Sequence, residues 1–537
     1  MLDSFFFDTA AREPDSPALW VDEHLYSYDE IAARAHRVAR GVTAALPAGG
    51  AARCLLFAHR SVAAYAGLLG ILEAGCAYVP LNPNVPAARI AAVIGQAGAS
   101  LLLVDRRCAR LLDEVVQLLD ECPRIVLLDD ADETDLVDHA APTTPASVLA
   151  KLSDVALEAT PPMRDVALRA SADFAYILFT SGSTGAPKGV PISHANARAY
   201  VSAQLSRIDR LPGARYVQFC ELTFDPSVHD MFVCWANGGC LYVPKTVEPI
   251  YNAAFIRQHA ITHWNSVPSV AGFMQQFRKL PAGEFPSLQL TVFGGEPLSR
   301  AVVDAWLRAA PNSRVINLYG PTEATVGCAA FEVTREFLDD ARHAVMPLGS
   351  ALPGTELLIV DAELEPVARG ESGELLIGGP QVAVGYLSPD EPGNCRFVAR
   401  TYPGTGSQRW YRSADAAREA PDGHLVFQGR LDTQVKIRGN RIELEEVEYV
   451  VQECSHAALC AVIAWPVDDA GRAGGLIAFV TRARRDAEQI LQACRQRLPV
   501  YAVPQRIVEL DALPLNVNGK IDKKTLAQHC VSGDVVI

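Results

Sequence analysis

A short polar segment, Phe179–Val190, has the residue types that bind a phosphate group. Its glycines allow the backbone to approach an anion closely, its hydroxyls can donate hydrogen bonds, and its lysine adds a positive charge. An aromatic and β-branched run precedes it and a helix is predicted from Ser193, so we expect a strand-to-helix turn with free backbone N–H groups. The predicted phosphate ligands are Thr180, Ser181, Gly182, Ser183, Thr184, Gly185 and Lys188.

Two commoner motifs do not fit this segment. The nucleotide P-loop has Gly-Lys followed at once by Ser or Thr, whereas Lys188 stands between Pro187 and Gly189. A serine-hydrolase elbow has Gly-x-Ser-x-Gly, whereas Ser183 lies in Gly-Ser-Thr-Gly. A flexible Ser/Gly linker is the structural alternative, but Pro and Lys at fixed places between a strand and a helix are not typical of linkers.

A second segment, Phe224–Phe232, contains a candidate substrate carboxylate. Asp225 suits a helix N-cap, and Pro226 suits the first helical position. A buried carboxylate at the mouth of a pocket would also need a positive partner, which a substrate ammonium group can supply. Because both interpretations can hold together, Asp225 is predicted to bind an ammonium group from the start of a helix.

The composition favours a soluble enzyme over a nucleic-acid-binding protein. The 537 residues carry 62 acidic and 48 basic side chains, and the net charge of −14 disfavours binding to phosphate backbones. Thirteen cysteines without a Cys-x-x-Cys pair indicate buried thiols in a reducing compartment. The N-terminus has no basic n-region, and Glu73, Gly75 and Pro80 interrupt the apolar stretch Ser61–Leu81. We expect a cytoplasmic protein with neither a nucleic-acid nor a membrane partner.

The elements that could position these residues alternate along the chain. Strand-like and helical segments alternate over 18–104 and 216–318, on either side of a polar stretch at 129–171, which predicts two open, mostly parallel sheets covered by helices. From about Met346, short alternating runs with turn residues predict an antiparallel barrel or sheet. The predicted fold class is α/β: a large N-terminal domain of two α/β-sheet subdomains plus a β-barrel-like subdomain, followed by a small C-terminal α/β domain.

The phosphate-binding segment resembles the phosphate-loop signature of the adenylate-forming superfamily, which includes acyl-CoA synthetases, luciferases and adenylation domains of nonribosomal peptide synthetases. Further signatures of the superfamily recur along nearly the whole chain. They are Tyr26–Ile31, Leu72–Asn82, Asn317–Glu323 (NLYGPTE), Tyr411–Asp415 (YRSAD), Gly429–Glu445, Leu498–Pro504 and Asn518–Lys523. The chain departs from them at Ser413-Ala414, where Thr-Gly is usual, and at Glu445, where Gly is usual. The loss of that glycine before Asp415 predicts a less tight backbone.

The resemblance implies binding of ATP and Mg²⁺. Tyr319 would lie against the adenine, and Thr322 near the α-phosphate. Glu323 would bind the magnesium ion, which prefers carboxylate oxygen. Lys520 would be the catalytic lysine, although by itself a lysine after Asn-Gly is most simply a solvated turn residue. Other residues placed on the nucleotide side are Gly294, Gly295, Glu296, Asn317, Gly320, and the ribose ligands Asp415 and Arg430.

Counting outward from the signatures places the family's amino-acid pocket on ten positions. They are Asp225, Pro226, His229, Asn265, Val292, Gly294, Leu318, Val326, Gly327 and Lys520. In amino-acid-activating members of the superfamily, the aspartate equivalent to Asp225 binds the α-amino group. His229 and Asn265 are polar and most of the others are small or apolar, which favours an amino acid with a small or hydrogen-bonding side chain, such as threonine.

The resemblance also implies two domains, residues 1–431 and 432–537, with Asp432 as the hinge of a swinging motion. Lys436, Arg438 and Gly439 would lie on the side of the carrier protein's pantetheine. The predicted function is ATP-dependent formation of an aminoacyl-AMP and its transfer to the phosphopantetheine thiol of a discrete carrier protein in natural-product biosynthesis. Only fourteen residues follow Lys523, so we expect a freestanding ligase. A small MbtH-like helper is a further candidate partner.

Two alternatives belong to other functional classes. An acyl- or aryl-acid CoA ligase would share the superfamily signatures, but such enzymes usually lack an aspartate at the position of Asp225. A noncatalytic carrier-binding homologue would not need to keep Lys520, Glu323 and Asp415. Activation of an amino acid in an ATP–pyrophosphate exchange assay, followed by loading of a carrier protein rather than coenzyme A, separates the three functions.

The role of Lys520 yields a prediction. We expect Lys520→Ala to slow adenylation by about 10²–10³-fold, because the variant loses a preorganised positive group at the reacting phosphate. Transfer of a preformed adenylate to a thiol should suffer less, because the small domain swings between the half-reactions. Pyrophosphate exchange and single-turnover thioester formation measure the two steps, and an equal loss in both would contradict the swing.

Overall fold

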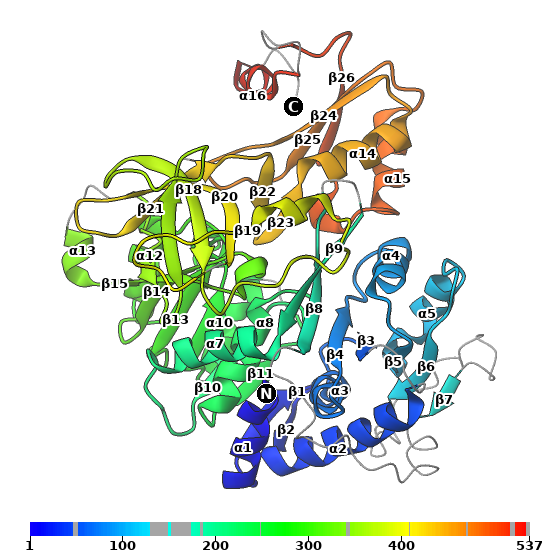
Figure 1. The fold of residues 1–537 in the computed structure, drawn as a ribbon, viewed down its shortest axis with the longest axis vertical. Helices are drawn as coiled ribbons and strands as arrows, with labels where there is room; N and C mark the ends of the chain where they lie inside the picture. Colours follow the sequence, from blue (N-terminus) through cyan, green and yellow to red (C-terminus); the bar gives the residue numbers. More distant parts are fainter. Residues whose placement is uncertain are drawn as a thin grey trace.

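The structure is a computed structural model that describes residues 1–46, 52–128, 149–151, 173–182, 186–246, 249–339, 344–407, 409–468, 471–515 and 521–532. Within these ranges the chain forms two large α/β sheets, an antiparallel sheet and a C-terminal α/β unit (Figure 1). The predicted α/β class is therefore confirmed. The predicted domain boundary at Asp432 stays a prediction.

The first large sheet has the strand order β7-β6-β5-β3-β4-β8-β9. Its neighbouring strands are parallel except for β8 and β9. The strands are β3 (Arg53–Phe57), β4 (Ala77–Leu81), β5 (Leu101–Asp105), β6 (Arg124–Leu128), β7 (Leu149–Lys151), β8 (Phe174–Thr180) and β9 (Lys188–Ser193). The helices of this part are α2 (Tyr28–Ala45), α3 (Val62–Glu73), α4 (Ala87–Ala97), α5 (Ala109–Val116) and the short η1 (Arg106–Cys108). The apolar stretch 61–81 is a buried helix followed by a strand, as predicted.

The second large sheet has the order β16-β15-β14-β13-β12-β10-β11-β1-β2 and is parallel from β14 to β1. Its strands are β1 (Pro17–Val21), β2 (His24–Ser27), β10 (Arg215–Val217), β11 (Cys240–Val243), β12 (His263–Ser266), β13 (Leu290–Gly294), β14 (Arg314–Tyr319), β15 (Ala329–Val333) and β16 (Ser350–Ala351). The helices are α1 (Ser4–Arg12), α7 (His194–Leu205), α8 (Pro226–Val228), η3 (His229–Val233), α9 (Cys234–Ala236), α10 (Pro249–Gln258), α11 (Pro268–Gln276), α12 (Arg300–Ala309), η4 (Thr322–Ala324) and α13 (Arg335–Asp339).

One buried core joins the two sheets. It combines side chains of the first sheet, such as Leu56, with side chains of the second, such as Leu241 and Val292, and with those of α2 and α3. The other face of the second sheet packs on α11 and α12, and the other face of the first on α4 and α5. Because burial of apolar surface drives folding, this shared core fixes the two sheets relative to each other.

An antiparallel sheet follows, as the sequence pattern predicts. Its order is β17-β18-β20-β19, with β21 also paired to β20. The elements are β17 (Glu356–Val360), β18 (Ser372–Gly378), η5 (Pro392–Arg396), β19 (Phe397–Ala399), β20 (Arg409–Glu419) and β21 (Leu425–Arg430). The sheet carries Asp415 on β20 and Arg430 at the end of β21, so it brings two predicted ribose ligands next to the large sheets.

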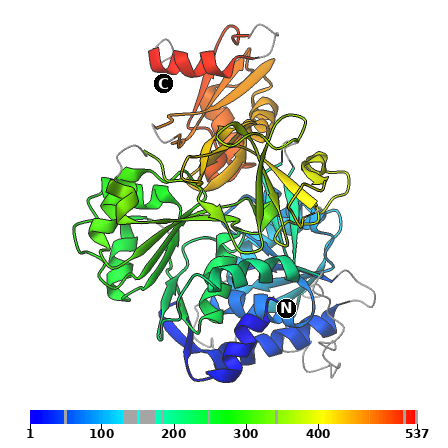
Figure 2. The ribbon, with the colours of Figure 1, turned by 60° about the vertical axis from the view of Figure 1, so that its left-hand side comes forward.

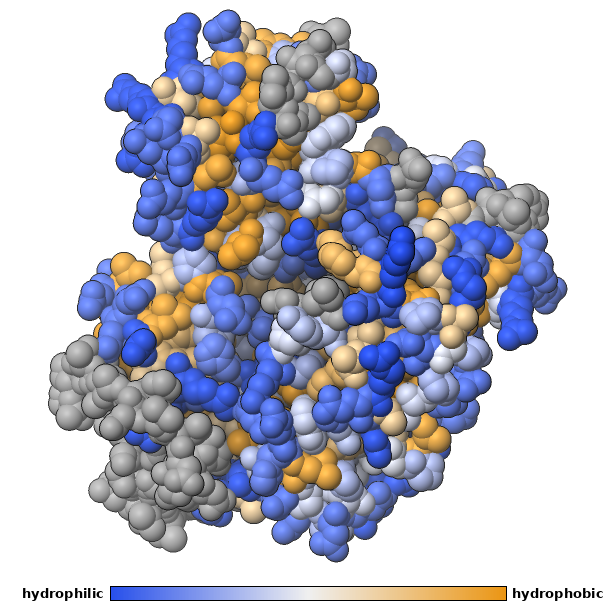
Figure 3. All heavy atoms as spheres, turned by 180° about the vertical axis from the view of Figure 1, so that it is seen from behind, coloured by the Kyte–Doolittle hydropathy of each residue, from blue (hydrophilic) through white to orange (hydrophobic). Residues whose placement is uncertain are grey.

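The C-terminal unit begins with a hairpin of β22 (Gln434–Ile437) and β23 (Asn440–Glu443). A three-stranded sheet follows, built from β24 (Leu459–Ala464), β25 (Leu476–Thr481) and β26 (Arg506–Glu509), together with α14 (Leu444–Ser455), α15 (Ala487–Arg495), η6 (Val500–Ala502) and α16 (Lys523–Ser532). Separate apolar clusters cover its two faces. The unit stands as a lobe at one end of the molecule (Figure 2), and from behind a notch separates it on one side from the larger part (Figure 3).

One local prediction is wrong. The phosphate-binding segment is not a strand-to-helix turn but the loop of a β-hairpin, in which Thr180 pairs with Lys188. Helix α7 begins only at His194, after β9. The buried apolar run Val190–Ile192 extends the sheet beside β8, so the chain returns as a strand before the helix starts. The polar stretch 129–171 lies outside the described residues except for β7.

Among the described helices, none is both long and apolar enough to cross a membrane. The thirteen cysteines are free thiols, and ten of them are buried, as the sequence predicts.

Candidate active site

The predicted site residues gather where the strands β12, β13 and β14 end. These strands are parallel and in register, with Asn265 beside Val292 and Gly294 beside Leu318. The carboxyl ends of parallel strands form a common edge at which side chains from different strands meet. The hairpin loop after β8, the antiparallel sheet and the hairpin β22–β23 close in on the same edge.

The phosphate loop is shaped by its first glycine. A Cβ on Gly182 would lie 2.0 Å from the carbonyl oxygen of Ala186, so only glycine fits where the two sides of the loop meet. The hydroxyl of Thr180 is buried and has no hydrogen-bond partner among the described residues, which leaves it free to donate to a phosphate oxygen. Ser183, Thr184 and Gly185 lie outside the described residues.

Two residues of the phosphate loop contact the C-terminal hairpin instead of a ligand. Ser181 Oγ donates to the carbonyl oxygen of Arg441 at 3.0 Å. Lys188, which is buried, forms an ion pair with Glu443 at 3.2 Å and lies over the ring of Tyr386. The positive charge predicted to bind phosphate is therefore present, but a carboxylate of the hairpin neutralises it in this arrangement.

Glu323 is the predicted magnesium ligand, and its side chain is fully buried. Arg441 Nη1 donates to its two carboxylate oxygens at 2.7 and 3.0 Å, and Tyr386 Oη donates to one of them at 2.6 Å. Burial alone would raise the pKa of Glu323, but Arg441 and Lys188 lower it to about 2. An ionised carboxylate that already attracts a cationic group suits a divalent cation, provided that Arg441 moves away.

The predicted adenine and ribose residues form a connected group. Tyr319 Oη donates to Asp415 Oδ2 at 2.5 Å, and Arg430 Nη1 donates to Asp415 Oδ1 at 2.8 Å. Ala414 adopts a left-handed conformation with φ of +57°, so this chain keeps the backbone shape that glycine would favour. The predicted loss of a tight backbone before Asp415 is therefore wrong, because alanine tolerates the conformation at some cost in strain.

Other residues assigned to the nucleotide side hold the protein's own backbone. Asn317 Nδ2 donates to the carbonyl oxygen of Pro347 at 2.7 Å, which ties β14 to the chain beyond β15. Gly320 packs so closely that a Cβ would lie 2.5 Å from the Cα of Gly327. Gly295 has a positive φ of 82° at the end of β13, next to Gly294, where glycine suits the turn. These contacts position the neighbouring Tyr319 and Thr322.

Glu296 anchors the tip of the C-terminal hairpin. Its carboxylate accepts from the backbone N–H of Gly439 at 2.6 Å and from that of Ser269 at 2.9 Å. Gly439 has a φ of +77°, and a Cβ there would lie 2.4 Å from the side chain of Val267. Arg438 stacks on the ring of Phe273, with 5.5 Å between its guanidinium carbon and the ring centroid. Arg438 and Gly439, two of the residues predicted to face the carrier side, thus lie at this edge of the large domain, whereas the charge of the third, Lys436, acts on Asp225 and Asp415.

The predicted hinge residue Asp432 is held between two arginines. Arg430 donates to both carboxylate oxygens, at 2.8 and 2.6 Å, and Arg396 donates to Oδ2 at 2.9 Å. These contacts lower the pKa of Asp432 in spite of its burial, which acts in the opposite direction. Because Arg430 also binds Asp415, the hinge position and the predicted ribose site share one side chain.

The predicted amino-acid pocket lies between the helical segment 226–233 and the strand ends. Asp225 occupies the N-cap position of α8, but its side chain makes no capping hydrogen bond. It hydrogen-bonds to Thr322 instead, and burial raises its pKa to about 6, against the effects of Thr322 and Lys436. Leu318 closes on Gly327, where a Cβ would lie 2.7 Å from the leucine side chain. Val292 and Val326 are buried in the same core, whereas Pro226 and Gly294 are partly exposed.

The polar pocket positions have partners in a layer behind them. His229 Nδ1 is hydrogen-bonded to the hydroxyl of the buried Tyr200 at 2.7 Å, and burial lowers the pKa of His229 to about 4. Asn265 Nδ2 donates to Asp230 Oδ1 at 2.8 Å. The ring of His229 is therefore neutral at physiological pH, and Asp230 is a second carboxylate beside the predicted pocket, buried where Asp225 is partly exposed.

Sequence reasoning missed several residues of this site. Asp230, Tyr200, Tyr386, Arg441 and Glu443 all contact predicted site residues. Asp230 could have been noticed as a second acid in the segment that carries Asp225, but its burial is a tertiary property. Lys520 lies outside the described residues.

A family comparison agrees with this geometry. A model described as "AMP-binding enzyme" matches residues 6–387, and one described as "AMP-binding enzyme C-terminal domain" matches residues 446–520. The chain belongs to the AMP-binding enzyme family.

Similar proteins extend over almost the whole of this AMP-binding enzyme. It is 34% identical over 528 residues to an L-proline--[L-prolyl-carrier protein] ligase of Pseudomonas fluorescens, covering 97% of each chain. It is 33% identical over 532 residues to a dimodular nonribosomal peptide synthase of Bacillus subtilis, but spans only 21% of that protein. Among solved structures, the Vibrio cholerae adenylation domain AlmE in complex with glycyl-adenosine-5'-phosphate has a TM-score of 0.84 at 29% identity, covering 99% of this chain and 98% of AlmE.

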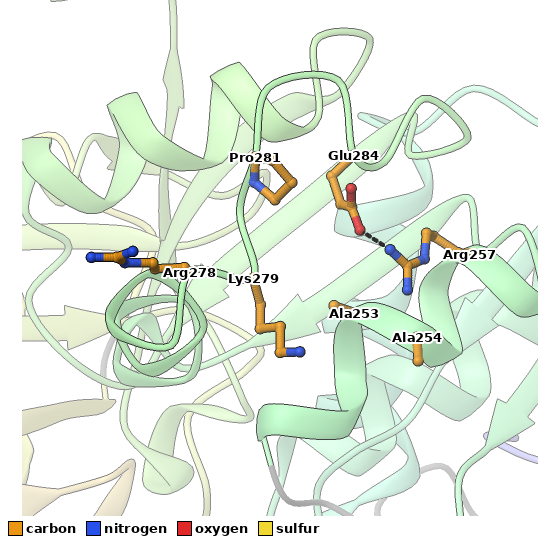
Figure 4. Close-up of a pocket in the computed structure, with 7 residues that line it drawn as sticks. All are labelled: Ala253, Ala254, Arg257, Arg278, Lys279, Pro281 and Glu284. Carbon is orange, nitrogen blue, oxygen red and sulfur yellow. Dashed lines mark hydrogen bonds and ion pairs between the residues drawn. The ribbon is translucent and has the colours of Figure 1, made fainter.

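Of two cavities in the AMP-binding enzyme, one adjoins the candidate site and the other lies apart from it. A cavity of about 430 Å³ adjoins the phosphate loop and is lined by Lys188, Tyr386 and neighbouring residues. A second cavity, of about 250 Å³, lies apart from the site between α10 and the chain after α11 (Figure 4). Arg257 and Glu284 form an ion pair across it, and it contains none of the predicted site residues.

The buried carboxylate of Asp230 yields a prediction about stability. Burial raises its pKa from 3.8 to about 7, although Asn265 and Cys220 oppose the shift. Asp230 therefore lowers the free energy of unfolding of the wild type as the pH rises from about 4 to above 7, because the unfolded chain releases this proton more readily than the folded one. We expect Asp230→Asn to gain stability over the wild type across that range, by up to about 4 kcal/mol. Chemical denaturation at several pH values measures this difference, and a pH-independent difference would contradict the shifted pKa.

Proposed function

We propose that the chain uses ATP to activate an α-amino acid as aminoacyl-AMP and transfers it to the phosphopantetheine thiol of a separate carrier protein in natural-product biosynthesis. The position of Asp225 carries this proposal. Its carboxylate lies at the start of α8, hydrogen-bonded to Thr322, which directly precedes Glu323. An ammonium group bound to Asp225 would thus lie close to the residues proposed to hold the reacting phosphate.

The first half-reaction requires alignment more than proton transfer. The substrate carboxylate is ionised at neutral pH, so it can attack the α-phosphorus of ATP without a general base, and pyrophosphate leaves. Asp225 would hold the ammonium group, and Thr180, Thr322 and Lys188 would donate to phosphate oxygens. Magnesium, bound to Glu323, would supply further charge stabilisation on the phosphates. Lys520 is proposed as the mobile catalytic cation.

The present arrangement suits the second half-reaction better than the first. Lys188 and Glu323, the two groups that would hold the charged end of ATP, are both paired with the hairpin β22–β23. Arg441 takes the place of the cation on Glu323, and Glu443 takes the place of a phosphate on Lys188. The hairpin can therefore dock here once pyrophosphate has left. We therefore assign residues 1–431 and 432–537 to two domains that change partners around Asp432 between the half-reactions.

The proposed substrate is a small or polar amino acid such as threonine. The predicted pocket positions include the small or apolar Val292, Gly294 and Leu318 and the polar His229 and Asn265. The proposed partners are the amino acid, a discrete carrier protein and a small MbtH-like helper. Support for the carrier comes from the proline ligase, whose name specifies a prolyl-carrier protein and whose whole length is similar to this chain.

An exchange assay tests the activity. We expect pyrophosphate exchange with at least one amino acid from a complete panel, and loading of a phosphopantetheinylated carrier protein in preference to coenzyme A. Asp225→Asn should lower kcat/KM of exchange by about 10²–10³-fold, because an ammonium group in the pocket loses its charged partner. Asp304→Asn, which changes a partly exposed acid on α12 that pairs with Arg300, is the matched control and should retain wild-type exchange. Exchange with carboxylic acids lacking an amino group, at undiminished rate, would favour a CoA ligase.

A substitution at the tip of the hairpin β22–β23 is expected to affect the two half-reactions differently. Gly439→Ala places a Cβ against Val267 and should prevent the hairpin from docking, so carrier loading should fall by about 10²-fold while exchange falls much less. Gly404→Ala is the matched control, because Gly404 has nearly the same φ, +78°, with open space around its Cβ position. Equal losses in exchange and loading for Gly439→Ala would contradict the assignment of this hairpin to the second step.

A further inference from the structure

Asp230 lies directly behind the proposed amino-acid pocket. It belongs to the π-helical turn η3, one residue after His229, and only 2% of it is exposed. A π-helical turn is rare, and such turns are frequent at functional sites. Among the described residues its side-chain hydrogen-bond partners are Asn265, which is a predicted pocket position, and Cys220, so the acid lies on the side of the pocket.

Both carboxylate oxygens of Asp230 act as acceptors. Asn265 Nδ2 donates to Oδ1 at 2.8 Å, and Cys220 Sγ donates to Oδ2 at 3.4 Å. An ionised carboxylate cannot donate a hydrogen bond, so a neighbouring amide can hydrogen-bond to it only through its NH₂ group and not through its carbonyl oxygen. The orientation of the Asn265 side chain thus follows from the charge of Asp230.

The other end of the Asn265 amide is its carbonyl oxygen. Asn265 is partly exposed, and it lies beside Val292 on the sheet face that also bears the pocket position Leu318. Among the described residues none donates a hydrogen bond to Asn265 Oδ1. With its NH₂ group held by Asp230, the amide presents an acceptor without a partner to the pocket.

We propose that Asp230 is a positioning residue that fixes Asn265 with its carbonyl toward the substrate, so that the pocket selects amino acids whose side chain carries a hydroxyl donor. This inference rests on the proposed amino-acid activation. A hydroxyl satisfies Asn265 Oδ1, whereas an isosteric methyl group leaves it buried and unpaired. A cationic side chain is disfavoured, because the nearby carboxylate of Asp230 is already engaged by Asn265 and Cys220.

Isosteric substrate pairs test the selection. The ratio of kcat/KM in pyrophosphate exchange is measured for threonine against valine, and for serine against 2-aminobutyrate, at about pH 8 to keep Asp230 ionised. We expect the hydroxyl substrate of at least one pair to be favoured by about 10–10²-fold. O-methylthreonine, which can accept but not donate, should be used no better than valine.

Variants separate an orienting role from a merely structural one. In Asp230→Leu the amide of Asn265 is released, so the hydroxyl preference should fall to a few-fold, and Asn265→Val should abolish it. The exchange of both residues, Asp230→Asn with Asn265→Asp, restores the hydrogen bond in reverse and again leaves an acceptor toward the pocket. We expect that double variant to recover the preference, which a simple packing role for Asp230 would not produce.

The matched control is Asp105→Asn. Asp105 is also a buried acid with two hydrogen-bond donors, Ser61 Oγ and the backbone N–H of Arg107, but it lies at the end of β5 and contacts no pocket residue. Its hydroxyl preference should equal that of the wild type. Thermal unfolding of each variant identifies any that fails to fold, and in that case Asn265→Val, which keeps Asp230, carries the test.

The outcomes are distinct. If no amino acid supports exchange, the proposed activity is wrong and this inference falls with it. If the wild type activates amino acids but treats each isosteric pair alike, the activity stands and the inference is overturned. If the preference exists but persists in folded Asp230→Leu, Asn265 is oriented by other groups and the role of Asp230 is refuted.

Discussion

The ion pair between Arg441 and Glu323 is the constraint on which the junction of the two parts depends. Glu323 is fully buried, and an ionised carboxylate in such a place is strongly destabilising unless a positive group compensates it. Arg441 comes from the C-terminal hairpin, so the charge balance of the large domain depends on a residue that lies more than a hundred positions away. The other contacts of the hairpin, with Glu296, Lys188 and Ser181, follow from its docking here.

This arrangement explains why one site can serve two steps in our proposal. Lys188 and Glu323 have opposite charges, and the hairpin supplies the complement of each through Glu443 and Arg441. A nucleotide with its cation would supply the same complements. Since either partner balances the buried charges, the two arrangements can differ little in free energy, and a bound ligand can shift the population between them.

Two aspartates at the predicted pocket, Asp225 and Asp230, have different surroundings and are therefore proposed to have different roles. Asp225 and Asp230 are five positions apart, and burial raises the pKa of both. Asp225 is partly exposed and hydrogen-bonds to Thr322, so it is available to a ligand. Asp230 is buried, and Asn265 and Cys220 satisfy its oxygens, so it can act only through those neighbours.

The sequence by itself determined the α/β class and the order of the sheets along the chain, because these depend on local periodicity, and contiguous motifs such as NLYGPTE gave the candidate site positions. It failed at the phosphate loop, which was predicted to lead directly into a helix but is followed by a strand, β9, that pairs with β8 before α7 begins. Only the tertiary structure decided which charges face one another, as for Arg441 with Glu323 and Asp230 with Asn265. Such pairs join residues distant in the chain, and their energies depend on burial, which no local pattern specifies.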